Sequence, residues 1–241
     1  MDEIITIYKD EKFKIEQFLK RLVNFFQDNP DLHKEPLPVV HSVKYRMKNE
    51  QHLADKIERK KALGVELTKD NLFEKITDLA GIRVLHLYSE QLRDIHNAIM
   101  QEVNNGDLVL YETPKAYTWD IDLKSFYEDL GIQTIVKPSY TSVHYVVMPK
   151  KGSEIKCEIQ VRTLYEEVWG EIDHSMNYPY ECESLACKEQ LKVLAQLTAA
   201  GTRLANSIVK SKGEYDKLKE KCLSLVQQFN QYKMQLKQAA S

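Results

Sequence analysis

The sequence predicts a mixed α/β fold, in which helices pack on a β-sheet and further helices extend the chain at both ends. Two patterns lead to this prediction. Short β-branched segments in the middle of the chain are interspersed with segments of helical spacing, and beyond Glu183 the pattern is wholly helical. A chain of 241 residues is long enough to bury a sizeable core. We expect an N-terminal helical extension over residues 1–35, an α/β domain over residues 36–182 and a C-terminal helical pair over residues 183–241.

The first element is an amphipathic helix from Glu11 to Gln27. Apolar residues recur in it at steps of three and four, and Asn29-Pro30 ends the pattern. This spacing gives the helix one buried face. After a Pro-containing stretch, we expect Val39 to Lys48 to be a basic loop or strand end that leads into a charged helix from Glu50 to Ala62.

The sheet is predicted from segments with the apolar and β-branched residues of buried strands. They span residues 81–88, 108–111, 133–136, 142–148 and 154–161. The first is followed by a helical pattern from Glu90 to Val103, and a polar hairpin over 149–153 joins the last two. These elements indicate a mixed sheet with helices packed on it.

The chain is expected to close with two helices, separated at Ser211-Lys212-Gly213. In the second helix, apolar residues alternate at steps of three and four from Tyr215 to Leu236, as in the seam of a coiled coil or helical hairpin. Two explanations remain open. The stripe packs on the preceding or the N-terminal helix, or it is a seam for a homo-oligomer or a partner protein.

Composition limits the class of protein. With 34 Lys and Arg against 36 Asp and Glu, the formal charge is −2, so an RNA partner would need a local basic site. The four cysteines have no CxxC or zinc-site spacing, which predicts reduced thiols and a cytoplasmic location. No signal pattern is present, and no apolar run approaches the ~18 residues that cross a bilayer, so we expect no membrane association.

Two carboxylates are candidate metal ligands. Asp78 stands just before the strand at 81–88 and Glu158 lies in the strand at 154–161, so adjacent pairing of these strands would bring both together. Carboxylates at strand edges suit a Mg²⁺ ion shared with phosphate oxygens. Without further context, a solvated or salt-bridged role explains such residues as well.

Basic residues strengthen the phosphate interpretation. Arg46 and Lys48 point the same way if their segment is extended. Further basic residues that polyphosphate binding would use are Lys44, Lys56, Arg59, Lys60, Lys61, Arg83 and Arg162. A solvated helix face explains the group at 59–61 as well. No Walker A, GxGxxG or GxSxG sequence is present, which disfavours P-loop, Rossmann and Ser-His-Asp enzymes.

Several segments together resemble the synthetase domain of the RelA/SpoT family, the enzymes that make the alarmone (p)ppGpp, and especially its small stand-alone members. In order between Val39 and Tyr180 they read YRMK with HLADKIERK, KITDLAGIRV, PSYTSVHYVV, CEIQVRT and VWGEIDHSMNYPY. The resemblance implies that residues 36–182 transfer the β,γ-diphosphate of ATP to the 3′-hydroxyl of GDP or GTP. It also implies a five-stranded mixed sheet of the nucleotidyltransferase type.

The resemblance implies a role for each matched position. Asp78 matches the magnesium-binding aspartate, and Glu158 matches the second acidic residue, which would also help to deprotonate the attacking hydroxyl. The matched residues of the ATP site are Arg46, Lys48, Lys56 and Arg83. The matched residues of the acceptor site are Tyr140, expected to stack on the acceptor base, with Lys137, His144, Gln160 and Arg162. We expect Trp169 and His174 to pack and support the site.

The acceptor half departs from the family pattern. The usual Gly-Tyr-Arg-Ser reads Ser139-Tyr140-Thr141-Ser142, the lysine expected before the tyrosine is displaced to Lys137, and Pro179 replaces a lysine after the closing Asn-Tyr. Fewer cations favour a less phosphorylated or differently held acceptor. The alternatives are therefore the 3′-terminal adenosine of tRNA, as in toxic members of the family, and an adenosine nucleotide that gives (p)ppApp.

The tRNA alternative draws on a basic N-terminal helix. Lys12, Lys14, Lys20 and Arg21 would meet the RNA backbone, and a solvated helix face explains them as well. A toxin would also imply an antitoxin-like partner. From a different class, the chain would be a catalytically silent interaction module, against which the intact Asp78 argues.

Overall fold

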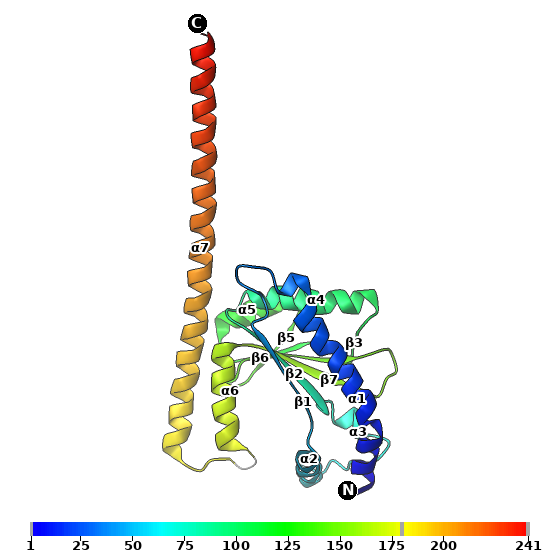
Figure 1. Ribbon diagram of the computed structural model, residues 1–241. Coiled ribbons are helices and arrows are strands. Elements are labelled where there is room, and N and C mark those ends of the chain that lie inside the picture. The colour runs from blue at the N-terminus through cyan, green and yellow to red at the C-terminus, as the bar shows by residue number, and fades with distance from the viewer. Residues whose placement is uncertain (1, 179–180, 240–241) are drawn as a thin grey trace. The chain divides into compact units, whose positions relative to one another are not determined.

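The computed structural model describes residues 2–178 and 181–239 (Figure 1). Pro179 and Tyr180, at the end of the VWGEIDHSMNYPY segment, lie outside the described residues. The chain divides into two compact units, Met1–Thr202 and Arg203–Ser241. The predicted mixed α/β class is confirmed, while the domain boundaries at 35/36 and 182/183 stay predictions.

A mixed seven-stranded sheet forms the centre of the first unit. Its strands are β1 (Ser42–Met47), β2 (Ala80–His86), β3 (Val109–Leu110), β4 (Lys115–Thr118), β5 (Gln133–Val136), β6 (Ser142–Met148) and β7 (Cys157–Thr163). The order is β1-β2-β7-β6-β4-β5, with β3 paired to β6. The pairs β2–β7 and β4–β5 are parallel, and the other pairs are antiparallel.

The sheet has two strands more than the five expected, namely β1 and β4. The sequence of β1, SVKYRM, has no buried residue at the sheet edge and carries basic residues, so it lacks the apolar density of a buried strand. β4 is only four residues long and begins with Lys115, so it is too short to show a clear alternation.

Helices and one 3-10 turn complete the chain. They are α1 (Asp2–Asp28), η1 (Pro30–Leu32), α2 (Glu50–Ala62), α3 (Leu72–Lys75), α4 (Gln91–Asn105), α5 (Ile121–Asp129), α6 (Leu164–Asn177) and α7 (Leu185–Ala239). The predicted N-terminal helix therefore begins nine residues earlier than Glu11, at Asp2. None of the helices within residues 2–178 and 181–239 has the length and apolar character needed to cross a membrane.

The core of the first unit lies between α1 and the sheet. The buried face of α1 includes Ile15, Leu22 and Phe26, which join one hydrophobic cluster with Ile82 and Ile159 of the central strands. Because side chains alternate along a strand, the neighbours of these strand residues point to the opposite face of the sheet. That second face carries the polar residues of the candidate site.

The predicted C-terminal helical pair is wrong, because α7 is a single helix from Leu185 to Ala239. Gly213 lies within it, and one glycine costs a helix only about 1 kcal/mol relative to alanine. The neighbouring Lys212 and Glu214 favour the helix. Residues 203–239 of the second unit are thus the later part of α7, and the apolar stripe from Tyr215 to Leu236 continues the same helix.

Candidate active site

Two parallel neighbours, β2 and β7, bring the two predicted carboxylates together. Gly81 of β2 is paired in register with Glu158 of β7, and Asp78 lies two residues before β2 begins. The predicted adjacency of these strands is therefore confirmed. Both carboxylates line a cavity of about 280 Å³ whose wall also includes Arg46 and Arg83.

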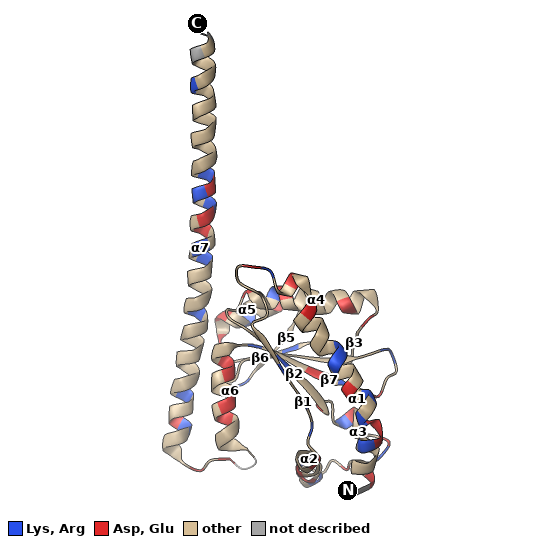
Figure 2. Cartoon of the chain, in the orientation of Figure 1, with Lys and Arg blue, Asp and Glu red and all other residues tan. Residues whose placement is uncertain are grey.

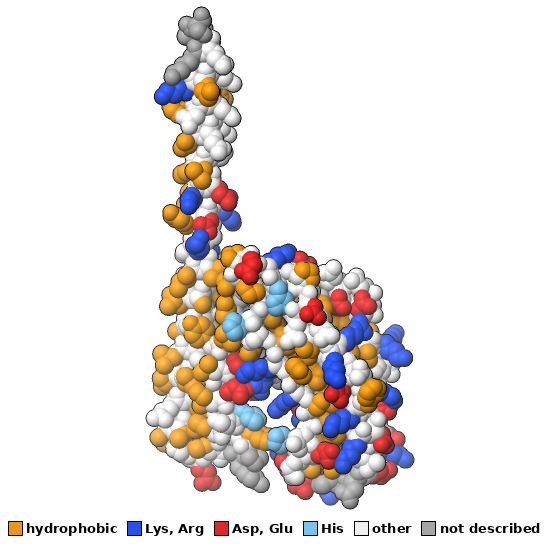
Figure 3. Space-filling model, in the orientation of Figure 1, with side chains coloured by type: hydrophobic (Ala, Val, Ile, Leu, Met, Phe, Trp, Pro, Cys, Tyr) orange, Lys and Arg blue, Asp and Glu red, His pale blue; other side chains and the backbone are white. Residues whose placement is uncertain are grey.

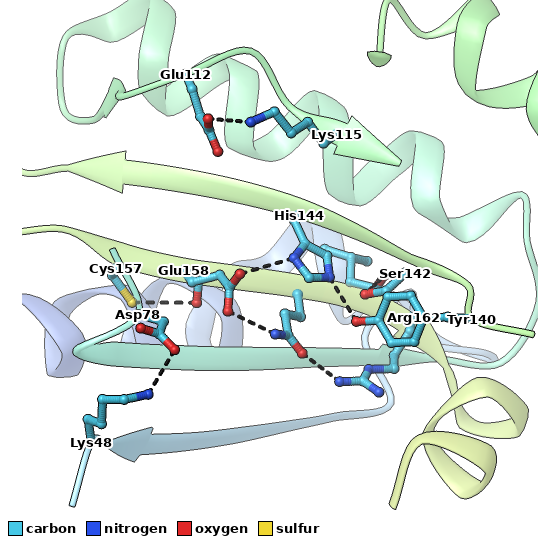
Figure 4. A network of polar contacts seen from close by, with 12 residues as sticks. Lys48, Asp78, Glu112, Lys115, Tyr140, Ser142, His144, Cys157, Glu158 and Arg162 are labelled. Carbon is cyan, nitrogen blue, oxygen red and sulfur yellow. Dashed lines mark hydrogen bonds and ion pairs between the residues drawn. The ribbon is translucent and has the colours of Figure 1, made fainter. Parts of the chain in front are cut away.

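Asp78 is held by two lysines that come from the segment before it. Lys48 Nζ donates to Asp78 Oδ2 at 2.8 Å (Figure 4), and Lys56 Nζ donates to Oδ1 at 2.7 Å. Burial would raise the pKa of Asp78, but the two ammonium groups outweigh it and lower the pKa to about 2. The pKa of Lys48 is also lowered, because burial of its ammonium outweighs the attraction of Asp78. Asp78 is thus ionised at neutral pH.

Glu158 is held by His144 of the neighbouring strand β6 and by Gln160 of its own strand. His144 Nδ1 lies 3.0 Å from Glu158 Oε1, and Gln160 Nε2 donates to Oε2 at 2.8 Å. Burial would raise the pKa of Glu158, but the contacts with His144 and Gln160 outweigh it and lower the pKa. The charge of Asp78 acts in the opposite direction, so the two carboxylates are close enough to repel each other.

This pair of carboxylates fits a magnesium ion. A cation between them would relieve their repulsion, and ionised oxygens are the ligands that Mg²⁺ prefers. Among the described residues, no group of three or more His, Cys, Asp or Glu side chains is arranged to hold a metal. Two protein carboxylates with water and substrate phosphate oxygens are the usual arrangement for Mg²⁺ at phosphate-transfer sites. Asp78 and Glu158 would therefore hold the ion jointly with a phosphorylated ligand.

A second, larger cavity of about 630 Å³ shares Arg46, Asp78 and His174 with the first. The remaining polar and aromatic residues of its wall are Lys48, Asn49, His52, Lys56, Arg59, Lys60 and Tyr178. In the space-filling view, a hollow of the first unit is bordered by basic, acidic and histidine side chains (Figure 3). The structure thus brings the four residues predicted for the ATP site around two adjoining cavities.

An aromatic contact joins α2 and α6 at the rim of the larger cavity. His174 is stacked on Tyr178, with ring centroids 4.7 Å apart, and His52 of α2 meets the same tyrosine edge-on at 5.4 Å. The guanidinium of Arg59 lies 5.4 Å from the Tyr178 ring centroid. His174 therefore supports the wall, as expected, and also lines both cavities.

Two residues predicted for the acceptor site, Tyr140 and His144, form a series of hydrogen bonds that ends at Glu158. Tyr140 Oη lies 2.9 Å from His144 Nε2, and His144 Nδ1 contacts Glu158 (Figure 4). Since an ionised carboxylate can only accept, His144 Nδ1 donates to Glu158. Lys137 Nζ sits 3.9 Å from the centroid of the Tyr140 ring. Trp169 packs against Tyr140 edge-on at 6.1 Å, which is the packing role predicted for it.

Arg162 is buried next to these hydrogen-bonded residues and contacts Gln160. Its side chain is only 4% exposed, and its Nη2 donates to Gln160 Oε1 at 2.5 Å. Its Nε lies 3.4 Å from Glu167 Oε2. Buried in this way, Arg162 orients Gln160, which in turn holds Glu158. A direct contact of Arg162 with an acceptor stays a prediction.

Sequence reasoning missed two carboxylates of α6, Glu167 and Glu171. Glu167 Oε1 accepts from Lys44 Nζ at 2.9 Å and from Arg83 Nη1 at 3.2 Å, and Arg83 Nη1 also pairs with Glu171. Burial would raise the pKa of Glu167, but Lys44, Arg162 and Arg83 outweigh it and lower the pKa. The available signal was their four-residue spacing, which places both side chains on one face of a helix.

The position of α6 is determined by where the helix begins. The helix begins directly after β7, with Thr163 and Glu166 as a capping box. Glu166 N donates to Thr163 Oγ1 at 3.2 Å, and Thr163 N donates to Glu166 Oε2 at 2.6 Å. Figure 2 shows acidic residues along α6. The capped turn fixes Glu167 next to the basic residues of β1 and β2.

Comparisons with family models, curated proteins and solved structures all lead to the same family. The family model described as "Region found in RelA / SpoT proteins" matches residues 45–183. The GTP pyrophosphokinase YwaC of Bacillus subtilis (strain 168) is 27% identical over 146 residues, which are 58% of this chain and 59% of YwaC. The chain thus spans less than two thirds of that curated relative.

Solved structures share the fold. The small alarmone synthetase 1 from Bacillus subtilis is 21% identical, with a TM-score of 0.61 over 87% of this chain and 98% of its own. The same protein has been solved bound to its product pppGpp and bound to AMPCPP. A GTP pyrophosphokinase family protein from Streptococcus pneumoniae is 19% identical, with a TM-score of 0.63 over 88% of this chain and 94% of its own.

Proposed function

The chain belongs to the RelA/SpoT family, and from this premise we propose that it is an ATP-dependent pyrophosphokinase. It would transfer the β,γ-diphosphate of ATP to a ribose 3′-hydroxyl and release AMP. The observation that carries the proposal is the ionised pair Asp78 and Glu158 on adjacent strands, in a cavity lined by cationic side chains. The activity in the name of YwaC and the AMPCPP-bound relative support the same reaction.

The donor nucleotide would occupy the two adjoining cavities. Lys48 and Lys56 reach Asp78, and Arg46 lines both cavities, so cations lie where a triphosphate would run past the carboxylates. Guanidinium and ammonium groups neutralise the charge that develops on phosphoryl oxygens during transfer. These side chains replace the backbone cradle of a P-loop.

Asp78 and Glu158 would hold the magnesium ion. When bound, the ion neutralises charge on the phosphate oxygens and polarises the phosphorus that is attacked. The residues of the chain do the rest of the work in the proposal: they place the donor and hold the acceptor hydroxyl in line with the β-phosphorus.

The acceptor would lie at Tyr140, with a guanosine nucleotide as the leading candidate, as the pppGpp-bound relative supports. Hydrogen bonds link Tyr140 to His144 and His144 to Glu158. In the proposed reaction, the 3′-hydroxyl proton passes to Glu158 and the 3′-oxygen bonds to the β-phosphorus. The bond from the β-phosphorus to the oxygen that links it to the α-phosphorus breaks, and AMP leaves with that oxygen.

The tRNA alternative has weaker support from the N-terminal helix. Lys14 and Lys20 pair with Glu11 and Glu16 of α1, and Arg21 pairs with Asp107. These carboxylates offset much of the charge that would attract a phosphate backbone. The tRNA acceptor, an adenosine acceptor, an antitoxin-like partner, a homo-oligomer through the terminal helices and a cytoplasmic location stay predictions.

Label transfer tests the proposal. The protein is incubated with Mg²⁺, ATP labelled at its γ-phosphate, and GDP, GTP, ADP or tRNA in turn, and one reaction contains ATP alone. We expect label on GDP or GTP, with one AMP formed for each label transferred. Label on tRNA alone would establish the toxin alternative. Absence of label on every acceptor, without AMP formation, would contradict the pyrophosphokinase and leave the silent interaction module.

A further inference from the structure

Glu171 forms an ion pair with the guanidinium of Arg83 at the wall of the smaller cavity. Both side chains line that cavity together with Asp78 and Glu158. The side chain of Glu171 is 51% exposed, so it can turn into solvent without leaving a buried charge behind. The exposed carboxylate of Glu171 would therefore compete with an entering phosphate group for the guanidinium of Arg83.

Glu167, one helical turn earlier, has the opposite character. Its side chain is only 6% exposed and contacts Lys44 of β1, Arg83 of β2 and Arg162 of β7. Removing the Glu167 carboxylate would leave the buried guanidinium of Arg162 without its carboxylate, which is costly. Glu167 is therefore the fixed partner that holds Arg83 in place, and Glu171 is the exchangeable one.

The charges of this cluster favour the exchange. Three cations, Lys44, Arg83 and Arg162, face two carboxylates, Glu167 and Glu171, so one positive charge remains while both carboxylates are in place. When Glu171 turns away, the excess within this five-residue cluster rises to two positive charges. A phosphate group carries the charge and the acceptor oxygens to replace it, and a guanidinium binds phosphate with paired hydrogen bonds.

We propose that Glu171 is a resident anion that a phosphate group of the donor nucleotide must displace from Arg83. This inference rests on the proposed function and adds a determinant of its substrate class. Ligands that bring a polyphosphate compensate for the lost ion pair, whereas a nucleoside without phosphate cannot. Glu171 thereby lowers the affinity of the site for every nucleotide. Only a ligand with enough negative charge to replace Glu171 at Arg83 binds well.

Calorimetric titration with Mg²⁺ and AMPCPP tests the inference on three proteins: the wild type, Glu171→Gln and Glu128→Gln. Glu128 is a matched control, because it is a 53% exposed carboxylate paired with Lys124 on α5, away from the cavity. We expect Glu171→Gln to lower the Kd about 3- to 10-fold, the size expected for one partly exposed ion pair. The control should bind as the wild type does, and adenosine should gain nothing from Glu171→Gln.

The outcomes separate this inference from the proposed function. If the wild type binds AMPCPP and Glu171→Gln binds it equally or more weakly, Glu171 is no competitor and the inference fails while nucleotide binding stands. A Glu171→Ala variant should show the same gain, since removal of the charge is the cause. Absence of AMPCPP binding to all of the proteins would overturn the inference together with the proposed function.

Discussion

Gly170 leaves room for the guanidinium of Arg162. A Cβ built at position 170 would lie 2.4 Å from Arg162 Nη1, and the arginine side chain is buried, so it cannot move aside freely. The contact matters because Arg162 donates to Gln160, and Gln160 donates to Glu158. One missing side chain on α6 thus helps to set the position of a candidate catalytic carboxylate on β7.

Gly170→Ala should therefore reduce activity. The methyl group pushes Arg162 away from Gln160, while alanine improves helix propensity by about 1 kcal/mol. We expect kcat/KM to fall roughly 10-fold, about 1.4 kcal/mol of transition-state stabilisation. Gly213→Ala is the matched control, because a Cβ there meets nothing within 4 Å. Equal activity of both variants in steady-state assays would show that Arg162 does not position Gln160.

Ser139 has a backbone conformation that favours glycine, with φ of 61°. A left-handed conformation costs a residue with a side chain about 1–2 kcal/mol, and the extra freedom of unfolded glycine offsets part of the gain. Ser139→Gly should therefore raise the free energy of unfolding by about 0.5–1 kcal/mol, as measured in urea. Ser139→Ala retains the strain and should show no gain. Equal effects of the two substitutions would contradict this explanation.

Asp78 should make stability depend on pH in the acid range. Its pKa is about 2 in the folded protein against an ordinary value of 3.8, so its contribution is present above pH ~4 and is lost as the pH falls towards 2. The loss should be on the order of 1–2 kcal/mol. The difference in unfolding free energy between wild type and Asp78→Asn should shrink over this window. A difference that stays constant from pH 5 to pH 2 would contradict the lowered pKa.

Tyr140 should control the acceptor and leave the donor unaffected. Tyr140→Ala removes the ring expected to stack on the acceptor base, and such stacking is worth about 1–3 kcal/mol. We expect the KM for the acceptor to rise at least 10-fold, with the KM for ATP unchanged. Tyr140→Phe keeps the ring and loses only the contact with His144, so a smaller rise is expected. Steady-state kinetics with each substrate varied separately distinguish these effects, and a rise in the KM for ATP alone would assign Tyr140 to the donor site.

Much of the central sheet could be predicted from local patterns. The strands at β2, β6 and β7 carry dense apolar residues, and the juxtaposition of Asp78 and Glu158 followed from pairing two of them. The edge strand β1 was harder to recognise, because its exposed basic side chains serve the cavity wall. The single helix α7 was mistaken for a pair, because a glycine breaks a helix less reliably than local reasoning assumes.

The parts of the site that were missed depend on contacts distant in sequence. Glu167 meets Lys44 across 123 positions and Arg83 across 84, so no local pattern links them. Arg162 shares a strand face with Glu158 and Gln160, yet the packing of α6 buries it behind them. Local sequence shows which side chains share a face, but packing decides which of them a ligand can reach.

The rate of AMP formation in Asp78→Asn tests the central claim most directly. Wild type, Asp78→Asn and Asp31→Asn are assayed with ATP, GDP and Mg²⁺. Asp31 is the control, because it is an exposed carboxylate of η1 that is paired with Lys34. We predict that Asp78→Asn lowers the rate at least 100-fold, as expected when a preorganised charge at a phosphoryl-transfer site is lost, and that Asp31→Asn retains the wild-type rate. AMP formation by Asp78→Asn at the wild-type rate would contradict the account.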